Sequence, residues 1–339
     1  MDNISDSQKV HKTVIATPAG VVASQHKRAA QVGAAVLAAG GDAVDAAVAT
    51  SFALGVVEPW MSGAMAGGCM VLWRADERRA QVVDYGMRSP RGLNPKDYPL
   101  SGAGPSSDLF PWPAVVGDRN VQGATAVAVP GVVSGMGLAH ERYGRKPWRE
   151  LVQPAVQMAR EGLLVDWYSG LVTASSAKAL SLDPHAAAMF LDEGTWPIMG
   201  SWTGTTPRRL DQRALAASLQ TIAIEGPRAL YEGSLARALA QDVQAKGGCL
   251  AEADLAAYQA QWVERMLAVV MYVFNRDDEL LSGLVRDCPG AAASIIHINC
   301  NNARWTHPVQ WLVRTVIGMN RDRTVCLHKY QALRGGQMC

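Results

Sequence analysis

The sequence predicts an α/β fold, in which helices pack on a β-sheet. Three observations support this prediction: an alanine-rich pair of helices within residues 26–49, two short apolar strands at 69–73 and 80–84, and amphipathic helices farther along the chain. Alanine and leucine favour helix, whereas short apolar runs bounded by turn residues favour buried strands. With 49% hydrophobic residues among 339, the chain can bury a large core.

The helical pair is divided by Gly40 and Gly41. Two consecutive glycines end a helix and let the chain turn. Asp42 is predicted to cap the second helix by accepting a backbone N–H, and Asp45 to add negative charge at its positive end. The small alanine side chains predict that these helices pack closely on each other or on a sheet.

A hairpin is predicted after this pair, because residues 69–73 and 80–84 are apolar and a polar turn separates them. A glycine-rich passage at 62–68 precedes the first strand. The second strand leads to Arg88 and Pro90, and this strand end is predicted to line a pocket. The glycines precede a strand instead of following one into a helix, so they do not match a dinucleotide-binding motif.

The middle of the chain is predicted to alternate between loop, strand and helix. Residues 95–120 are rich in proline, glycine and aspartate and are expected to form a long surface loop. A buried strand is expected at 125–129, followed by a helix over 132–143. His140 on this helix is interpreted as a packed or partly exposed side chain, not a catalytic one. Further helices are expected within residues 154–162, 215–225 and 234–245.

The order of these features resembles the gamma-glutamyltransferase family. The family pattern is a helix, Gly-Gly-Asn-Ala-x-Asp-Ala, Val-x-Glu-Pro, and Ser-Gly-x-Gly-Gly-Gly before the first strand. Here Asp42 stands in the Asn position, and Met65 and Ala66 interrupt the glycine run. A second match is Gly-Gly-x-hydrophobic-x-x-x-Asp-Leu-x-x-Tyr at residues 247–258. The resemblance covers about residues 14–264.

This resemblance implies an N-terminal nucleophile hydrolase fold, a four-layer αββα sandwich, present here in incomplete form. Residues 1–264 would be a large-subunit region that acts on a small-molecule gamma-glutamyl or other amide substrate, with no metal or organic cofactor. In the family, self-cleavage exposes the threonine of Thr-Thr-His-x-Ser at the start of a small subunit. Its hydroxyl forms an acyl-enzyme, and its own α-amine serves as the base.

The chain contains no Thr-Thr-His-x-Ser, and its nearest echo is Trp305-Thr306-His307-Pro308. This short stretch lacks the second threonine and the serine, so no catalytic residue is assigned. The family's small subunit is accordingly missing from this chain. The resemblance therefore implies gamma-glutamyl transfer or hydrolysis by the family, with this chain inactive alone.

Arg88 is the candidate substrate-binding residue. In the family, Arg-Glu-x-Ala-Pro follows the second strand, and its arginine binds the α-carboxylate of the substrate; counting back from Pro90, that position is Gly86. Arg88 lies two residues later, where it can bind a carboxylate or remain a solvated surface group. Because Gly-x-Arg-Ser-Pro is more similar to the acylase branches of the superfamily, an acylase or small-amide hydrolase is the alternative, together with a non-catalytic remnant.

The tail at residues 265–339 shows no family resemblance, and a shifted reading frame after Glu264 is the favoured hypothesis. The alternatives are a divergent helical extension around residues 311–317 and a metal site. A zinc site is not predicted, because no Cys-x-x-Cys pair is present. The residues considered for that site are Cys288, Cys300, Cys326 and His328.

Charge and the first residues bear on partners and location. Lys+Arg 32 and Asp+Glu 30 nearly balance, which does not indicate a nucleic-acid partner or a basic membrane face. Glycines and aspartates interrupt the apolar stretch at 29–57, so a transmembrane helix is not predicted. The first residues lack the basic and apolar parts of a signal peptide, and Cys69 in an apolar strand fits a reducing compartment. A cytoplasmic location is expected.

Overall fold

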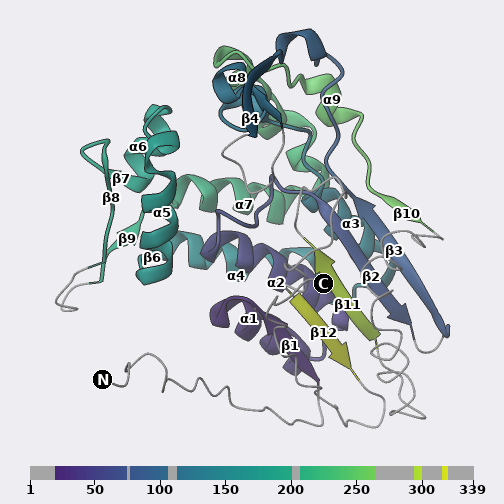
Figure 1. Ribbon diagram of the computed structural model, residues 1–339. Helices are drawn as coiled ribbons and strands as arrows, with labels where there is room; N and C mark the ends of the chain where they lie inside the picture. Colours follow the sequence, from purple (N-terminus) through teal and green to yellow (C-terminus); the bar gives the residue numbers. More distant parts are fainter. Residues whose placement is uncertain are drawn as a thin grey trace, which may run out of the picture.

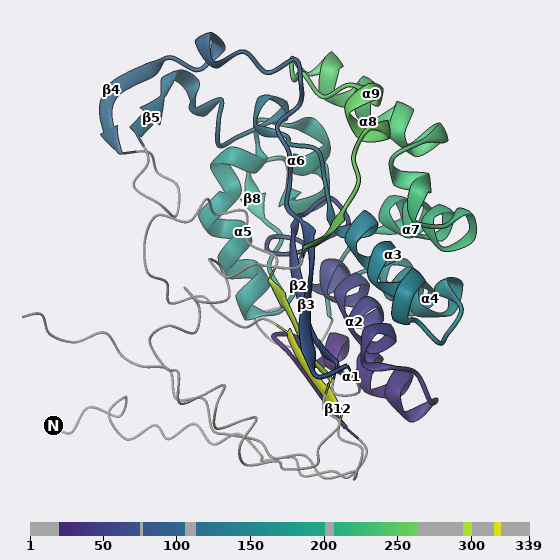
Figure 2. The same ribbon diagram turned by 90° about the vertical axis from the view of Figure 1, so that its right-hand side faces the viewer.

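The computed structural model describes residues 20–74, 77–105, 113–200, 207–263, 294–299 and 315–319. Within these residues, helices pack against one face of a six-stranded sheet, which Figure 2 shows nearly edge-on. The predicted α/β class is therefore confirmed. The other sheets among these residues are two-stranded ribbons.

The helices and strands follow each other along the chain as Figure 1 labels them. The helices are α1 (Lys27–Ala38), α2 (Ala43–Val57), α3 (Val132–Tyr143), α4 (Trp148–Glu161), α5 (Trp167–Leu180), α6 (Pro184–Phe190), α7 (Arg213–Glu225), α8 (Gly233–Ala245) and α9 (Glu252–Ala256). The strands of the large sheet are β1 (Val21–Ser24), β2 (Gly68–Arg74), β3 (Arg79–Tyr85), β10 (Gln261–Val263), β11 (Ser294–Asn299) and β12 (Thr315–Met319). The ribbons are formed by β4 (Leu100–Pro105) with β5 (Pro113–Val115), β6 (Leu163–Leu164) with β9 (Arg209–Leu210), and β7 (Leu191–Asp192) with β8 (Trp196–Pro197).

The strand order in the large sheet is β1-β12-β11-β2-β3-β10, and all neighbours are antiparallel. The predicted hairpin is confirmed, because β2 and β3 pair from Gly68 with Tyr85 to Arg74 with Arg79. Two segments from the tail, β11 and β12, lie between β1 and β2 (Figure 1). Among the described strands, β1 therefore joins the sheet through β12.

The two alanine-rich helices end and begin as predicted. The N–H of Gly40 donates to the Leu37 carbonyl and that of Gly41 to the Val36 carbonyl, and Gly40 has φ +83°, which is the usual glycine-led helix end. The side chain of Asp42 accepts the N–H of Val44 and so caps α2.

Helix α2 is the central helix of the core, and each of its residues is buried. Helix α1 lies close to it because Gly33 has no side chain: a Cβ there would lie 2.1 Å from Oγ1 of Thr50. Helix α4 packs on α2, and α7 packs on α4, so helices extend three deep from the sheet (Figure 2).

Two sequence predictions between the strands and α3 are wrong. Residues 125–129 do not form a strand: Ala124–Ala126 is a 3₁₀ turn, and Val129 makes an isolated bridge with Arg88. Pro130 follows directly and has no N–H with which to extend the pairing. The predicted surface loop at 95–120 contains the β4–β5 ribbon, in which glycines and prolines form an exposed hairpin.

The predicted helices at 132–143, 154–162, 215–225 and 234–245 are found as α3, the second half of α4, α7 and α8. In the part of the chain that the structure describes, no helix has both the length and the apolar character to cross a membrane.

Candidate functional site

The end of β3 is the structural centre of the candidate site. Tyr85, its last residue, is fully buried, and its hydroxyl donates to the Cys69 carbonyl at 3.2 Å. Gly135 of α3 lies against the Tyr85 ring, where a Cβ would come within 2.2 Å of a ring carbon. This contact joins the strand to α3. Of the residues that follow, Gly86 and Met87 are half-buried, Arg88 and Ser89 are exposed, and Pro90 is buried.

The glycine-rich passage at 62–68 lies against this strand end. A Cβ on Gly67 would lie 2.6 Å from Cγ of Met87, so only glycine permits this approach. The carbonyl of Ala66 accepts the N–H groups of Gly131 and Val132 at 2.9 and 3.0 Å, which attaches the passage to the start of α3. The glycines thus bring two loops and a helix start together.

Gly131 allows the closest of these approaches. A Cβ there would lie 1.9 Å from the Tyr85 carbonyl oxygen and 2.4 Å from the Tyr258 hydroxyl. That hydroxyl donates to the Gly86 carbonyl at 2.8 Å. Burial raises the pKa of Tyr258, with Arg88 opposing and Asp84 adding to the shift, so the phenol remains a hydrogen-bond donor.

The Tyr258 ring is itself fixed by its neighbours. It stacks on Tyr231, with ring centroids 5.6 Å apart, and the Tyr231 hydroxyl accepts the N–H of Ser134 at 3.0 Å. Arg228 donates to the Tyr258 carbonyl at 2.9 Å. The strand end is therefore supported by groups that come from distant parts of the sequence.

A second link joins the same segments beside the site. Arg91 donates from its backbone N–H and from Nε to Oδ1 of Asp254, at 3.2 and 3.0 Å. Burial raises the pKa of the Asp254 carboxyl, but hydrogen bonds from Arg91 and from the N–H of Ala251 outweigh it and hold this pKa below its ordinary value. Asp254 is thus charged and structural at neutral pH.

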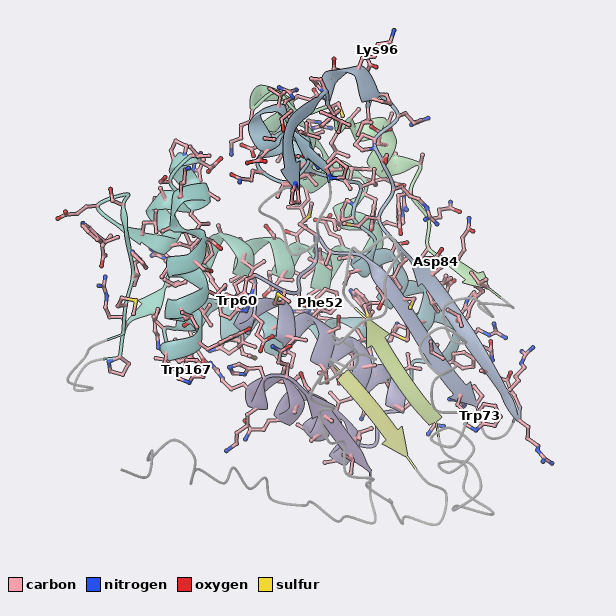
Figure 3. The ribbon with its side chains drawn as sticks, viewed as in Figure 1. Phe52, Trp60, Trp73, Asp84, Lys96 and Trp167 are labelled. Carbon is pink, nitrogen blue, oxygen red and sulfur yellow. The ribbon has the colours of Figure 1, made fainter. Side chains whose placement is uncertain are left out.

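Arg88, the predicted substrate-binding residue, lies at this strand end. Its backbone pairs with Val129 in both directions, with N–O distances of 3.3 and 2.9 Å. Its Nη2 lies 3.2 Å from Oδ2 of Asp84, whose position at the top of β3 is labelled in Figure 3, and the Arg88 side chain is 54% exposed. Substrate binding by Arg88 stays a prediction.

Sequence reasoning did not single out Asp84 or assign a role to Tyr258. Asp84 belongs to a strand, and its side chain is directed by the twofold alternation away from the buried neighbours Val83 and Tyr85. Tyr258 is part of the second family-like pattern, at residues 247–258. Its contact with Gly86 spans 172 positions and leaves no local signal in the sequence.

The other chemical candidates lie away from this strand end. His140 bonds through Nε2 to the Lys146 carbonyl at 2.7 Å and packs edge-on to Trp148, so it is a packed side chain as interpreted. The four residues weighed for zinc and the stretch at 305–308 lie outside the described residues. In the ranges described, no cluster of three or more His, Cys, Asp or Glu side chains has the geometry of a metal site.

A family model described as Gamma-glutamyltranspeptidase matches residues 29–282, well over half of the chain. The chain belongs to the gamma-glutamyltranspeptidase family. The matched region includes both patterns on which the resemblance depends. It ends beyond the predicted boundary at 264, in a stretch that the structure does not describe.

Two proteins with similar sequences illustrate the relationship. The acylase ACY 1 proenzyme of Pseudomonas sp. (strain SE83) is 40% identical over 243 residues, which are 71% of this chain and 41% of the relative. The glutathione hydrolase proenzyme of Escherichia coli (strain K12) is 35% identical over 248 residues, which are 73% of this chain and 39% of the relative. The chain thus spans about two fifths of the length of these relatives.

Solved structures of gamma-glutamyltranspeptidase type share the fold. The Helicobacter pylori gamma-glutamyltranspeptidase aligns with a TM-score of 0.62 and 25% identity over 75% of this chain and 67% of that one. The cephalosporin acylase of Bacillus halodurans aligns with a TM-score of 0.63 and 26% identity over 78% of this chain and 46% of that one. Both transpeptidase and acylase structures therefore resemble the described region.

Proposed function

We propose that this chain is the scaffold portion of an amide-bond enzyme that transfers or hydrolyses gamma-glutamyl groups. The observation that carries the proposal is the family match over residues 29–282. The substrate class is that of relatives named glutathione hydrolase, which the chain matches over only part of their length. The substrate is a small-molecule gamma-glutamyl amide.

The chemistry proposed is that of an N-terminal threonine. Its hydroxyl attacks the amide carbonyl, its α-amine takes the proton, and the resulting acyl-enzyme is passed to water or an amine. Backbone N–H groups stabilise the negative charge that develops on the carbonyl oxygen. Thr-Thr-His-x-Ser does not occur in the 339 residues, so we expect this chain alone to be inactive.

Arg88 is the residue of this chain that we propose to contact the substrate. A guanidinium selects carboxylates through charge and paired N–H donors, and this one is exposed at a strand end where a small molecule can reach it. Gly67 packs closely against Met87, and Gly131 against Tyr85, so both glycines support the strand end from which Arg88 extends.

An acylase is the second candidate function. Two observations favour it: glycine occupies position 86, where the resemblance places a carboxylate-binding arginine, and the relative that is 40% identical is named an acylase proenzyme. An acylase of this type would hydrolyse an amide whose acyl group need not carry an α-carboxylate.

We also propose that the complete molecule is a four-layer sandwich. Met70 and Leu72 of β2 are buried in the core that α2 occupies. Val71 and Trp73, which alternate with them along the strand, lie on the opposite face of the sheet and are only half-buried. A second sheet packed on that face would complete their burial. The predicted domain division at 264 and the cytoplasmic location stay predictions.

The experiment that tests this function uses two proteins. The 339-residue chain should release no chromophore from a gamma-glutamyl anilide. A chimera that joins residues 1–263 to the C-terminal portion of the related acylase proenzyme should process itself and release chromophore. Turnover by the chain alone would contradict its inactivity, and a folded, processed chimera that acts on neither gamma-glutamyl nor acyl anilides would contradict the proposed function.

A further inference from the structure

Asp84 and Arg88 form an ion pair at the end of β3 that a dissolved ligand can reach. Nη2 of Arg88 lies 3.2 Å from Oδ2 of Asp84, and the two side chains are 54% and 31% exposed. An exposed pair of this kind contributes little to folding stability. Its position beside the candidate site therefore suggests a role in ligand selection.

Asp84 is held in place independently of Arg88. Its Oδ1 accepts the N–H of Gly86 at 2.9 Å, which leaves Oδ2 for the guanidinium. Because the hydrogen bond from the Gly86 N–H fixes the Asp84 carboxylate, the anionic partner of the Arg88 guanidinium has a constant position.

The backbone around the pair is fixed as well. The Gly86 carbonyl accepts from the Tyr258 hydroxyl at 2.8 Å, and the Arg88 backbone is bridged to Val129. The movement open to the pair is thus rotation of the long Arg88 side chain. A carboxylate that approaches Arg88 must displace Asp84 or share the guanidinium with it.

We propose that Asp84 is a specificity-determining residue, whose carboxylate competes with the carboxylate of a ligand for the guanidinium of Arg88. The inference rests on the proposed function, in which Arg88 contacts the substrate. Asp84 lowers the affinity for carboxylate-bearing acyl groups and leaves the affinity for neutral ones unchanged. The ratio between gamma-glutamyl and neutral acyl substrates is then set by this internal acid.

The test compares glutarate with its uncharged counterpart glutaramide, titrated against the full 339-residue chain by NMR at constant ionic strength. The variant is Asp84→Asn, because the amide oxygen of asparagine can still accept the Gly86 N–H while the charge that holds Arg88 is lost. Its matched control is Asp192→Asn, which removes the same charge from an exposed pair between Asp192 of β7 and Arg208. Arg88→Gln, alone and combined with Asp84→Asn, removes the guanidinium.

We expect Asp84→Asn to bind glutarate about two- to fivefold more tightly than the unmodified chain, the range that corresponds to an exposed ion pair. Glutaramide binding should not change. Arg88→Gln should abolish the gain, and Asp192→Asn should show none. The Arg88 Nε–H resonance should shift in Asp84→Asn before any ligand is added.

The possible outcomes distinguish a failure of this inference from a failure of the proposed function. If Arg88→Gln weakens glutarate binding but Asp84→Asn does not strengthen it, Asp84 does not compete, and Arg88 remains a carboxylate contact. If Arg88→Gln does not change glutarate binding, neither Arg88 nor Asp84 selects the substrate. The same conclusion follows if Asp84→Asn does not bind glutarate at millimolar concentration. An equal gain in Asp192→Asn would assign the effect to net charge and overturn the inference. Turnover by the chimera tests the family chemistry separately.

Discussion

Gly86 illustrates how one residue can change the chemistry of a site without loosening it. Both of its backbone polar groups are bonded, the N–H to Asp84 and the carbonyl to Tyr258. In the family pattern this position carries an arginine side chain. The present chain keeps the backbone fixed there and places its guanidinium two residues later, paired with an acid.

Tyr258→Phe should lower the free energy of unfolding by about 1–2 kcal/mol, because the partly buried Gly86 carbonyl would lose the hydrogen bond from a buried tyrosine. The phenyl ring can keep its stacking on Tyr231. Tyr98→Phe is the control: it removes a similar bond, to the Thr125 carbonyl at 2.8 Å, from a more exposed position and should cost less. Urea unfolding of both variants measures the difference, and equal losses would contradict the role given to burial.

Asp254 should make the protein less stable in acid. Its folded pKa lies below the ordinary value of 3.8, so its contribution is complete above that value and is lost as pH falls through the folded pKa. The stability difference between the unmodified chain and Asp254→Asn should therefore be constant at neutral pH and shrink below about pH 4. Unfolding curves measured from neutral to acid pH test this. A stability difference that grows on acidification would show that folding raises the pKa of Asp254 instead of lowering it.

The α1–α2 pair shows local rules and packing acting together. Gly40 and Gly41 end α1, and Asp42 caps α2, as expected from the sequence. The capping is reinforced by a contact that the sequence does not indicate: the carboxylate of Asp45 accepts the N–H of Arg145 at 3.0 Å. Through this bond to Arg145, the first turn of α2 also fixes the turn between α3 and α4.

Gly33→Ala should destabilise the protein by about 1–3 kcal/mol, because the new methyl group would overlap the Thr50 side chain of α2. This cost exceeds the gain of about 1 kcal/mol that alanine brings to a helix. Gln31→Ala, on an exposed position of the same helix, is the control and should change stability by less than about 0.5 kcal/mol. Thermal unfolding of the two variants distinguishes the steric overlap with Thr50 from the change in helix propensity. A Gly33→Ala variant that is more stable than the unmodified chain would contradict the close packing of α1 on α2.

On the scale of the whole molecule, the large sheet contains strands from the first and the last parts of the described chain. β11 and β12 come from the tail and separate β1 from β2 in the sheet. The sequence motifs indicated no family resemblance in the tail, although the family model extends to residue 282. The element considered there was a helical extension around residues 311–317, whereas Thr315–Met319 forms the strand β12. In the described structure these segments contribute backbone hydrogen bonds to both neighbours.

A chain truncated after Val263 should be less stable and more prone to associate, because β2 would become an edge strand and β1 would lose β12. We expect a loss of about 2 kcal/mol or more, or a decrease in Tm of about 4–8 °C for a chain of this size. Calorimetry and light scattering of the two chains provide the measurement. An unchanged Tm would show that the tail does not contribute to the sheet, as a shifted reading frame predicts.

The elements that could be predicted are those whose signals lie within a few residues. Paired glycines, an aspartate cap and short apolar runs separated by a polar turn act over a few neighbouring residues, so α1, α2 and the β2–β3 hairpin follow from the sequence. The apolar run at 125–129 was misread, since apolar residues are buried in turns as well as in strands. Its turn depends on contacts with distant groups, such as Gly248 against the Ala124 carbonyl.

The sequence alone was sufficient for the family, the α/β class and the presence of an arginine near the end of the second strand. The tertiary structure alone decided which groups surround that arginine: Asp84 holds its side chain, Val129 its backbone, and Tyr258 the neighbouring carbonyl. Local propensity depends on the nearest few residues along the chain. A charge or a hydroxyl acts through space, so its partner is known only once the fold has brought the two together.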